Sequence, residues 1–273
     1  MVKMQEILFL GAGNMARALV AGLVRQGWPP ASITVCAPHA ERREALAAAF
    51  GVHATPAQAH AITPGSTVIL AVKPKNIAAV LAAWQGPFRH ARPLLISVAA
   101  GIPVASLQRA LGEALPVVRA MPNTPAQIGA GATALFASPE VNAEQRQGAA
   151  AILGAVGSIH WLEDENLMDI VTALSGSGPA YVLLFMEALE DAAVAQGLDR
   201  PSARALALQT VLGTARMAAE TGQSPTSLRH QVTSPGGTTA AALAVWEEGL
   251  RSLAQRALAA AAQRSRTLAP NED

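Results

Sequence analysis

The sequence has a single cysteine, few charged residues and almost no net charge. Cys36 has no second cysteine to pair with, and the apolar stretch around it predicts a buried thiol. The lack of disulfides favours a reducing, cytoplasmic location. A formal net charge of +1 provides no basic field for nucleic acid or for a membrane surface, so neither is expected as a partner.

Signals for a metal, a leader or a membrane span are also lacking. The six histidines show none of the spacings of a metal site, so no metal is expected. The first residues run directly into an expected strand without a signal-peptide core. The alanine-rich stretches at 180–195 and 251–269 are interrupted by charged and amide side chains, which predicts that they do not span a bilayer.

Hydrophobic residues make up 51% of the chain and charged residues 14%, a composition that favours extensive helix packing or subunit contacts. A length of 273 residues favours two domains. Strands and helices alternate up to about residue 162, and everything after it reads as helix. We therefore expect an α/β chain, with a Rossmann-type doubly wound sheet at 1–162 and an all-α domain at 163–273.

The chain opens with a dinucleotide-binding fingerprint, G-x-G-x-x-A, between an apolar strand at 7–10 and a helix at 14–26. In this pattern Gly11 makes the turn, Gly13 lets the backbone approach a pyrophosphate, and Ala16 lets the helix pack on the strand. An ordinary strand-turn-helix is the alternative, but the context favours a cofactor held by the N–H groups of the helix start. The contacts expected here are Gly11, Gly13, Asn14 and Met15.

The second expected strand, 33–37, is not followed by the acidic residue that commonly binds the ribose of NAD. Arg42 and Arg43 follow instead, close enough to meet a 2′-phosphate, with His39 as a further donor. This pattern favours NADPH, although the arginines could be a solvated helix face and Glu41 could serve a ribose, so NADH stays possible.

Two further apolar runs, at 67–72 and 94–98, have the pattern of parallel strands covered on both faces. Ligands of an open parallel sheet bind beyond the carboxyl ends of its strands, and small residues there permit close approach. Short connections without a ligand would look the same. The cofactor contacts predicted at these ends are Ala71, Val72, Lys73, Ala99 and Ala100.

Three loops have the chemistry of site walls. The prolines of 122–125 make a rigid loop after a strand at 116–121, and the small residues of 175–179 predict a tight bend between two helices. The loop at 233–239 gathers hydroxyls and glycines at a helix start, which favours an anion site for a carboxylate. A helix capped by its own hydroxyl is the alternative for this third loop.

The sequence resembles the pyrroline-5-carboxylate reductases over its whole length, in the motifs at 11–15, 71–74, 97–101, 119–125, 174–181 and 234–239. The resemblance implies reduction of the cyclic imine 1-pyrroline-5-carboxylate to L-proline by NADPH or NADH, the final step of proline biosynthesis. It also implies a helical domain that interlocks with a partner subunit in a homodimer, with dimers assembled further. Where many relatives carry a Ser, Thr or Asn beside the adenosine ribose, this chain has Pro38 and His39.

The resemblance also assigns residues to the substrate. It implies that the Thr239 hydroxyl donates to the ring nitrogen as the catalytic group. An imine is basic enough to be protonated without a strong acid, so no catalytic His or Asp is needed, and orientation and electrostatics supply the rate. The substrate-binding residues implied are Met121, Asn123, Ser175, Ser177, Ser234, Gly236, Gly237 and Thr238.

Two other functions share part of this pattern. A 3-hydroxyacid dehydrogenase also joins a Rossmann domain to a helical one, but it needs a lysine on the helix, and the chain after Ser177 has none. A non-catalytic NADPH-binding regulator would keep the first glycine loop and lose the loop at 233–239, whereas both are present.

Overall fold

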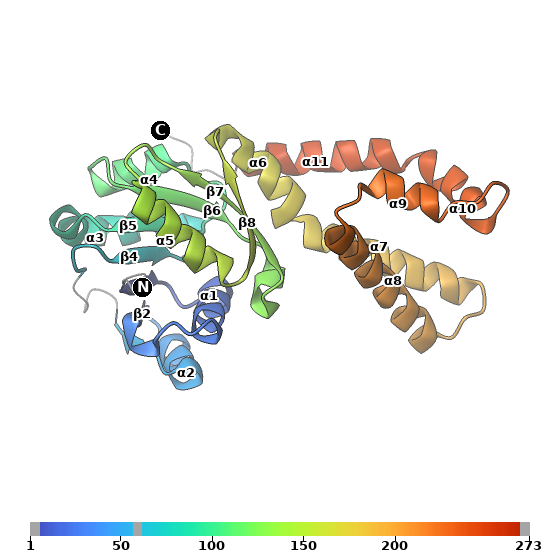
Figure 1. Ribbon diagram of the computed structural model, residues 1–273. Coiled ribbons are helices and arrows are strands. Elements are labelled where there is room, and N and C mark those ends of the chain that lie inside the picture. The colour runs from blue at the N-terminus through green and yellow to red at the C-terminus, as the bar shows by residue number, and fades with distance from the viewer. Residues whose placement is uncertain (1–5, 57–61, 268–273) are drawn as a thin grey trace. The chain divides into compact units, whose positions relative to one another are not determined.

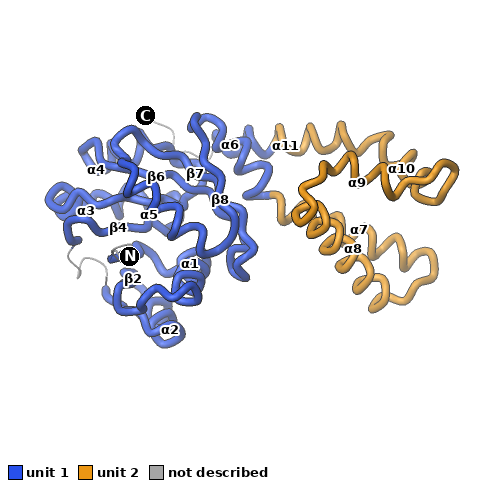
Figure 2. Tube along the Cα trace, viewed as in Figure 1, with its two compact units in different colours: residues 1–177, 261–273 blue, residues 178–260 orange. Residues whose placement is uncertain are grey.

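A computed structural model describes residues 6–56 and 62–267. The chain forms two compact units (Figure 2), one of residues 1–177 with 261–273 and one of residues 178–260. The last strand ends at Leu162, where the sequence pattern changes, whereas the compact units divide after Ser177. The first helical turns after the sheet therefore belong to the sheet unit.

The first unit is built on an eight-stranded sheet with the order β3-β2-β1-β4-β5-β6-β7-β8 (Figure 1). Strands β1 to β6 are parallel, β7 runs antiparallel to β6, and β8 runs parallel to β7. The strands are β1 (Ile7–Leu10), β2 (Ile33–Cys36), β3 (His53–Thr55), β4 (Thr67–Leu70), β5 (Leu94–Ser97), β6 (Val117–Met121), β7 (Gly131–Ala137) and β8 (Gly157–Leu162).

Helices cover both faces of the sheet, because successive residues of a strand point to opposite sides. In β1, Ile7 and Phe9 join one core and Leu8 and Leu10 the other. The first core is shared with α1 (Asn14–Arg25), α2 (Ala40–Phe50) and α5 (Ala143–Gly154), and the second with α3 (Ile77–Ala91) and α4 (Val104–Leu111). This doubly wound arrangement confirms the expected fold class. Cys36 is buried as predicted.

Two elements differ from expectation. The edge strand β3 was not predicted, because it has only three residues and its side chains are largely exposed. Helix α3 runs to Ala91 with Pro87 inside it, although a proline commonly ends or kinks a helix. Trp84 and Phe88 are both buried in the second core, and this packing outweighs the backbone bond that the proline removes.

The chain leaves the sheet through a 3-10 turn at Glu165–Leu167, helix α6 (Met168–Val171) and the π-helical turn η5 (Thr172–Gly176). A tight bend was expected at 175–179, but the helix widens into a π turn and restarts as α7. The end of the chain is tied to the same unit, because the Ser265 hydroxyl donates to the Asp169 carboxylate at 2.6 Å.

The second unit is entirely helical. It contains α7 (Gly178–Ala195), α8 (Arg200–Thr221), α9 (Pro225–Gln231), α10 (Thr238–Glu247) and most of α11 (Leu250–Arg266). The Glu190 carboxylate joins α7 to α8, because Arg200 donates to it at 2.9 Å and Arg204 at 3.0 Å. Hydrogen bonds from Arg204 and then Arg200 hold the pKa of Glu190 below its usual value.

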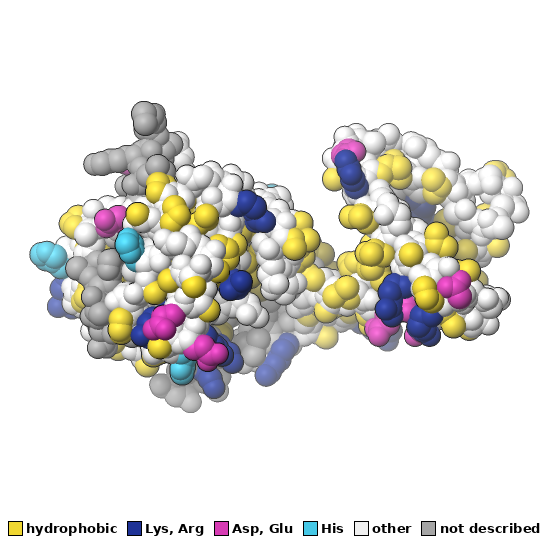
Figure 3. Space-filling view, turned by 90° about the horizontal axis from the view of Figure 1, so that it is seen from below, with side chains coloured by type: hydrophobic (Ala, Val, Ile, Leu, Met, Phe, Trp, Pro, Cys, Tyr) yellow, Lys and Arg dark blue, Asp and Glu magenta, His cyan; other side chains and the backbone are white. Residues whose placement is uncertain are grey.

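This unit has almost no core of its own. Among its apolar side chains only Ala203 and Leu228 are buried, while Leu183 and Leu184 are 63% and 65% exposed. Hydrophobic side chains lie between charged ones on the face drawn in Figure 3. In the described residues one helical stretch, Glu165–Ala195, is long and apolar enough to cross a membrane by length and composition, which is weak evidence for a span.

Candidate functional site

The turn between β1 and α1 admits only glycine at its first position. Gly11 has φ +116°, and a Cβ there would lie 2.5 Å from the Ala71 carbonyl oxygen. The Gly11 N–H donates to the Cys36 carbonyl at 2.9 Å, so the turn is held against the end of β2. Helix α1 then begins after Gly13, and no side chain caps it. Its first N–H groups are therefore available to an anion.

A cleft of about 580 Å³ opens beside this turn, at the carboxyl ends of β1 and β4. All its charged lining residues are positive, namely Arg17, Arg42 and Lys73. This is the charge expected around a phosphorylated ligand. The other lining residues are Ala12, Gly13, Asn14, Met15, Ala45, Leu46, Ala71 and Val72.

The residues predicted to meet a 2′-phosphate separate in the structure. Arg42 lines the cleft and is exposed. The Arg43 side chain is directed at the backbone, where it donates to the Ala37 and Pro38 carbonyls at 3.2 and 3.1 Å. His39 is an exposed residue at the start of α2 and does not line the cleft.

Some lining residues were missed by the sequence reasoning. Arg17 lies one helical turn after Asn14, and its guanidinium sits 5.3 Å from the centre of the Phe50 ring. The i, i+3 spacing places Arg17 on the same face of α1 as Asn14, so this residue could be predicted from the sequence. Ala45 and Leu46 carry no such signal, because their place depends on how α2 packs.

The end of β5 presents small residues, as the sequence predicted. Ala99 is buried and Ala100 is half-buried, and the Ala99 N–H lies 3.5 Å from the Ser97 hydroxyl oxygen. Neither alanine lines the cleft beside β1. Because β4 and β5 are parallel neighbours, their carboxyl ends share one edge of the sheet.

At the end of β6 the structure brings together Met121, Asn123 and the π turn. A Cβ on Gly176 would lie 2.5 Å from the Met121 methyl carbon, so these two residues are in close contact. Asn123 donates to the Ser175 carbonyl at 3.0 Å. Ser177 follows the turn, and its N–H donates to the Thr172 carbonyl at 2.8 Å.

The loop before α10 lies in the helical unit. Gly237 precedes the helix, and no side chain caps it. Ser234, Thr238 and Thr239 thus do not cap this helix. Gly236 has φ +70°, and a Cβ on Gly237 would lie 2.5 Å from the Ser234 hydroxyl oxygen. The positive φ favours glycine at 236, and Gly237 leaves room for the Ser234 hydroxyl.

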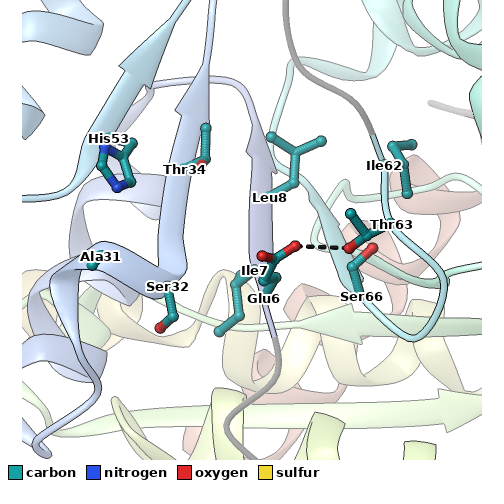
Figure 4. A pocket seen from close by; sticks show the side chains of 10 residues that line it. All are labelled: Glu6, Ile7, Leu8, Ala31, Ser32, Thr34, His53, Ile62, Thr63 and Ser66. Atoms are coloured by element: carbon teal, nitrogen blue, oxygen red, sulfur yellow. Dashed lines mark hydrogen bonds between the residues drawn. The ribbon is translucent and has the colours of Figure 1, made fainter.

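A second hollow, of about 220 Å³, lies at the opposite ends of the strands (Figure 4). Glu6, Ser32 and Ser66 each stand just before a strand there, and the Thr63 hydroxyl donates to Glu6 at 2.7 Å. Ligands of open α/β sheets bind at the carboxyl ends, so this hollow is not a dinucleotide site. The described residues contain no group of three or more His, Cys, Asp or Glu that could hold a metal ion.

Two family models match the chain. Residues 165–268 match the model described as pyrroline-5-carboxylate reductase dimerisation. Residues 6–101 match the model described as NADP oxidoreductase coenzyme F420-dependent, which covers the first strands of the sheet and the cationic cleft.

Curated relatives are similar over nearly the whole chain. A pyrroline-5-carboxylate reductase of Pseudomonas aeruginosa is 47% identical, with 97% of each chain covered. One of Synechocystis is 44% identical, with 96% of this chain and 98% of the relative covered.

Two solved structures, a pyrroline-5-carboxylate reductase and a pyrroline carboxylate reductase, are also similar. One from Coxiella burnetii is 43% identical with a TM-score of 0.93, over 98% of this chain and 100% of that chain. One from Plasmodium falciparum, with NADP bound, is 28% identical with a TM-score of 0.82, over 99% of this chain and 100% of that chain.

Proposed function

Because the chain belongs to the pyrroline-5-carboxylate reductase family, we propose that it reduces 1-pyrroline-5-carboxylate to L-proline with NADPH or NADH, the final step of proline biosynthesis. The observation that carries this function is that a chain of this family has both a cofactor site and an anion site. One is the glycine turn beside a cleft whose charged residues are all positive, and the other is the uncapped hydroxyl loop before α10.

The residues of the first cleft fit a dinucleotide. A cradle that a Cβ would fill at Gly11 and an uncapped helix start after Gly13 suit a pyrophosphate, and Arg42 suits a 2′-phosphate. When bound, the nicotinamide cofactor supplies the hydride. Of the other predicted cofactor residues, Asn14, Met15, Ala71, Val72 and Lys73 line this cleft, and Arg17 is added from the structure. His39, Arg43, Ala99 and Ala100 do not line it, and their contacts with the cofactor stay predictions.

The substrate carboxylate is assigned to the loop before α10. The N–H groups at Gly236, Gly237 and Thr238 and the Ser234 hydroxyl offer several donors to one anion, next to the positive end of a helix. Such a site orients the ring by its carboxylate, which lowers the entropic cost of bringing the imine carbon to the hydride donor. Met121, Ser175 and Ser177 are assigned to the walls around the ring.

Thr239 is assigned the catalytic contact. Its hydroxyl, one residue inside α10, is not used as a cap. We assign to it a hydrogen bond to the ring nitrogen as that nitrogen becomes an amine. The imine takes up its proton readily, so the hydroxyl needs only to hold the nitrogen in position and not to act as a strong acid.

We further assign a homodimer in which α7 to α11 cover one another across two subunits. The match to a dimerisation model and the scarcity of buried apolar side chains in this unit support it. Burial against the partner subunit also explains why the stretch Glu165–Ala195 is apolar without a membrane. Assembly of dimers into a larger oligomer and a cytoplasmic location complete the proposal.

The function is tested by NADPH absorbance with 1-pyrroline-5-carboxylate, together with chromatographic detection of proline. NADPH loss that depends on the imine and equals the proline formed supports the proposal. A parallel reaction with NADP⁺ and a 3-hydroxyacid should be inactive. Turnover of the hydroxyacid with no reduction of the imine would overturn the assignment.

A further inference from the structure

We infer that Asn123 is a positioning residue, whose side-chain amide holds the π turn η5 against the end of β6. This inference rests on the proposed function, in which Met121 and Ser175 form walls of the substrate site. The sequence predicted that Asn123 contacts the substrate itself. The contacts of its side chain point to a different role.

Both ends of the Asn123 amide have partners within the protein. Its Nδ2 donates to the Ser175 carbonyl at 3.0 Å, and its Oδ1 accepts the Ala132 N–H at 2.9 Å. The residue is only 9% exposed. A buried amide with a partner for both its oxygen and its nitrogen is a link between two segments, here the start of β7 and the π turn.

The sequence removes one backbone donor that the Ser175 carbonyl would have in an α-helix. In an α-helix the carbonyl of residue i accepts the N–H of residue i+4. Four residues after Ser175 stands Pro179, which has no N–H. The Asn123 amide gives this carbonyl a donor from outside the helix.

The hydroxyl of Ser175 is turned to its own helix. It donates to the Val171 carbonyl at 3.1 Å, and Thr172 makes the same kind of bond to Met168 at 2.8 Å. The position of the turn therefore depends on the bond from Asn123 and on the close contact of Gly176 with Met121. A shift of the turn moves the Met121 side chain with it, since the two leave no gap.

Asn123→Asp is the sharpest test, because it keeps the shape of the side chain and the acceptor for Ala132. At neutral pH it removes the donor and sets a carboxylate against the Ser175 carbonyl. We expect turnover to fall at least tenfold and the KM for the imine to rise, with NADPH affinity unchanged by fluorescence titration. Hydrogen exchange of the amides at 172–178 should become faster, with β1 and α1 unaffected.

A pH profile separates positioning from direct contact with the substrate. Burial and the facing Ser175 carbonyl raise the pKa of the introduced carboxyl group. Its protonated form has an O–H donor for that carbonyl and an acceptor for Ala132. The deficit relative to the parent should therefore shrink as the pH falls towards about 5, and the slow exchange at 172–178 should return with it.

Asn142→Asp is the matched control, since the exposed Asn142 side chain acts only as an acceptor, for the Gln145 N–H at 2.9 Å. It should change neither activity nor exchange at 172–178. Loss of activity in Asn123→Asp with normal exchange would overturn the inference in favour of direct substrate contact, and parental behaviour at every pH would overturn it outright. An inactive parent would contradict the proposed function alone, because the exchange measurement does not require turnover.

Discussion

Arg42→Gln should change the preference between the two cofactors and little else. Arg42 is exposed on the first turn of α2, lines the cationic cleft, and is not engaged by a carboxylate among the described residues. A hydrogen bond to a charged group is worth about 1.5–3 kcal/mol, and solvent screening at an exposed site reduces this to about 1–2 kcal/mol. The KM for NADPH should therefore rise roughly 5- to 30-fold.

The KM for NADH should stay within about twofold of the parent, because NADH lacks the 2′-phosphate. The assay is the initial rate of imine reduction with each cofactor. Lys75→Gln is the control for a general field effect, since Lys75 lies near the cleft but does not line it. Equal changes with NADPH and NADH in Arg42→Gln would refute the phosphate contact.

Arg43→Gln should behave differently although it is the adjacent residue. It replaces the guanidinium that donates to the Ala37 and Pro38 carbonyls with a shorter amide, which weakens the support of the loop between β2 and α2. The KM values for NADPH and NADH should therefore rise together. A change for NADPH alone would show that Arg43, as first predicted, also meets the phosphate.

Thr239→Val should lower turnover about ten- to a thousand-fold with NADPH affinity unchanged, whereas Ser234→Ala should act mainly on the KM for the imine; parental turnover in a folded Thr239→Val would contradict the donor role. Sedimentation at micromolar concentration should show a dimer or a larger assembly, and an active monomer would contradict the shared helical surface. Bonds from Arg251, and the charge of Arg229, lower the pKa of Glu247 to about 2. The free energy of unfolding contributed by this carboxylate is therefore present above its unfolded pKa of about 4.3 and is lost as the pH falls towards 2. In acid unfolding, Glu247→Gln should therefore lose less stability than the parent over this pH range.

Local patterns in the sequence were enough to predict the sheet domain. The apolar runs at β1, β4 and β5 and the glycine turn after β1 appear where they were expected, because short buried strands and tight turns depend on neighbouring residues.

Long-range packing explains the differences. Helix α3 continues through Pro87 because Trp84 and Phe88 are buried against the sheet, and a local rule cannot include that burial. The small residues at 175–179 predicted a bend, yet the chain forms a π turn, and Asn123, 52 residues earlier in the chain, donates to its Ser175 carbonyl.

The sequence by itself therefore determined the fold class, the glycine turn and the family motifs, because each depends on residue types at short fixed spacings. Only the tertiary structure separated Arg42 from Arg43 and gave Asn123 two protein partners. The physical reason is that adjacent or distant residues acquire different roles through the direction of their side chains, and this direction is set by packing between elements that are far apart in the chain.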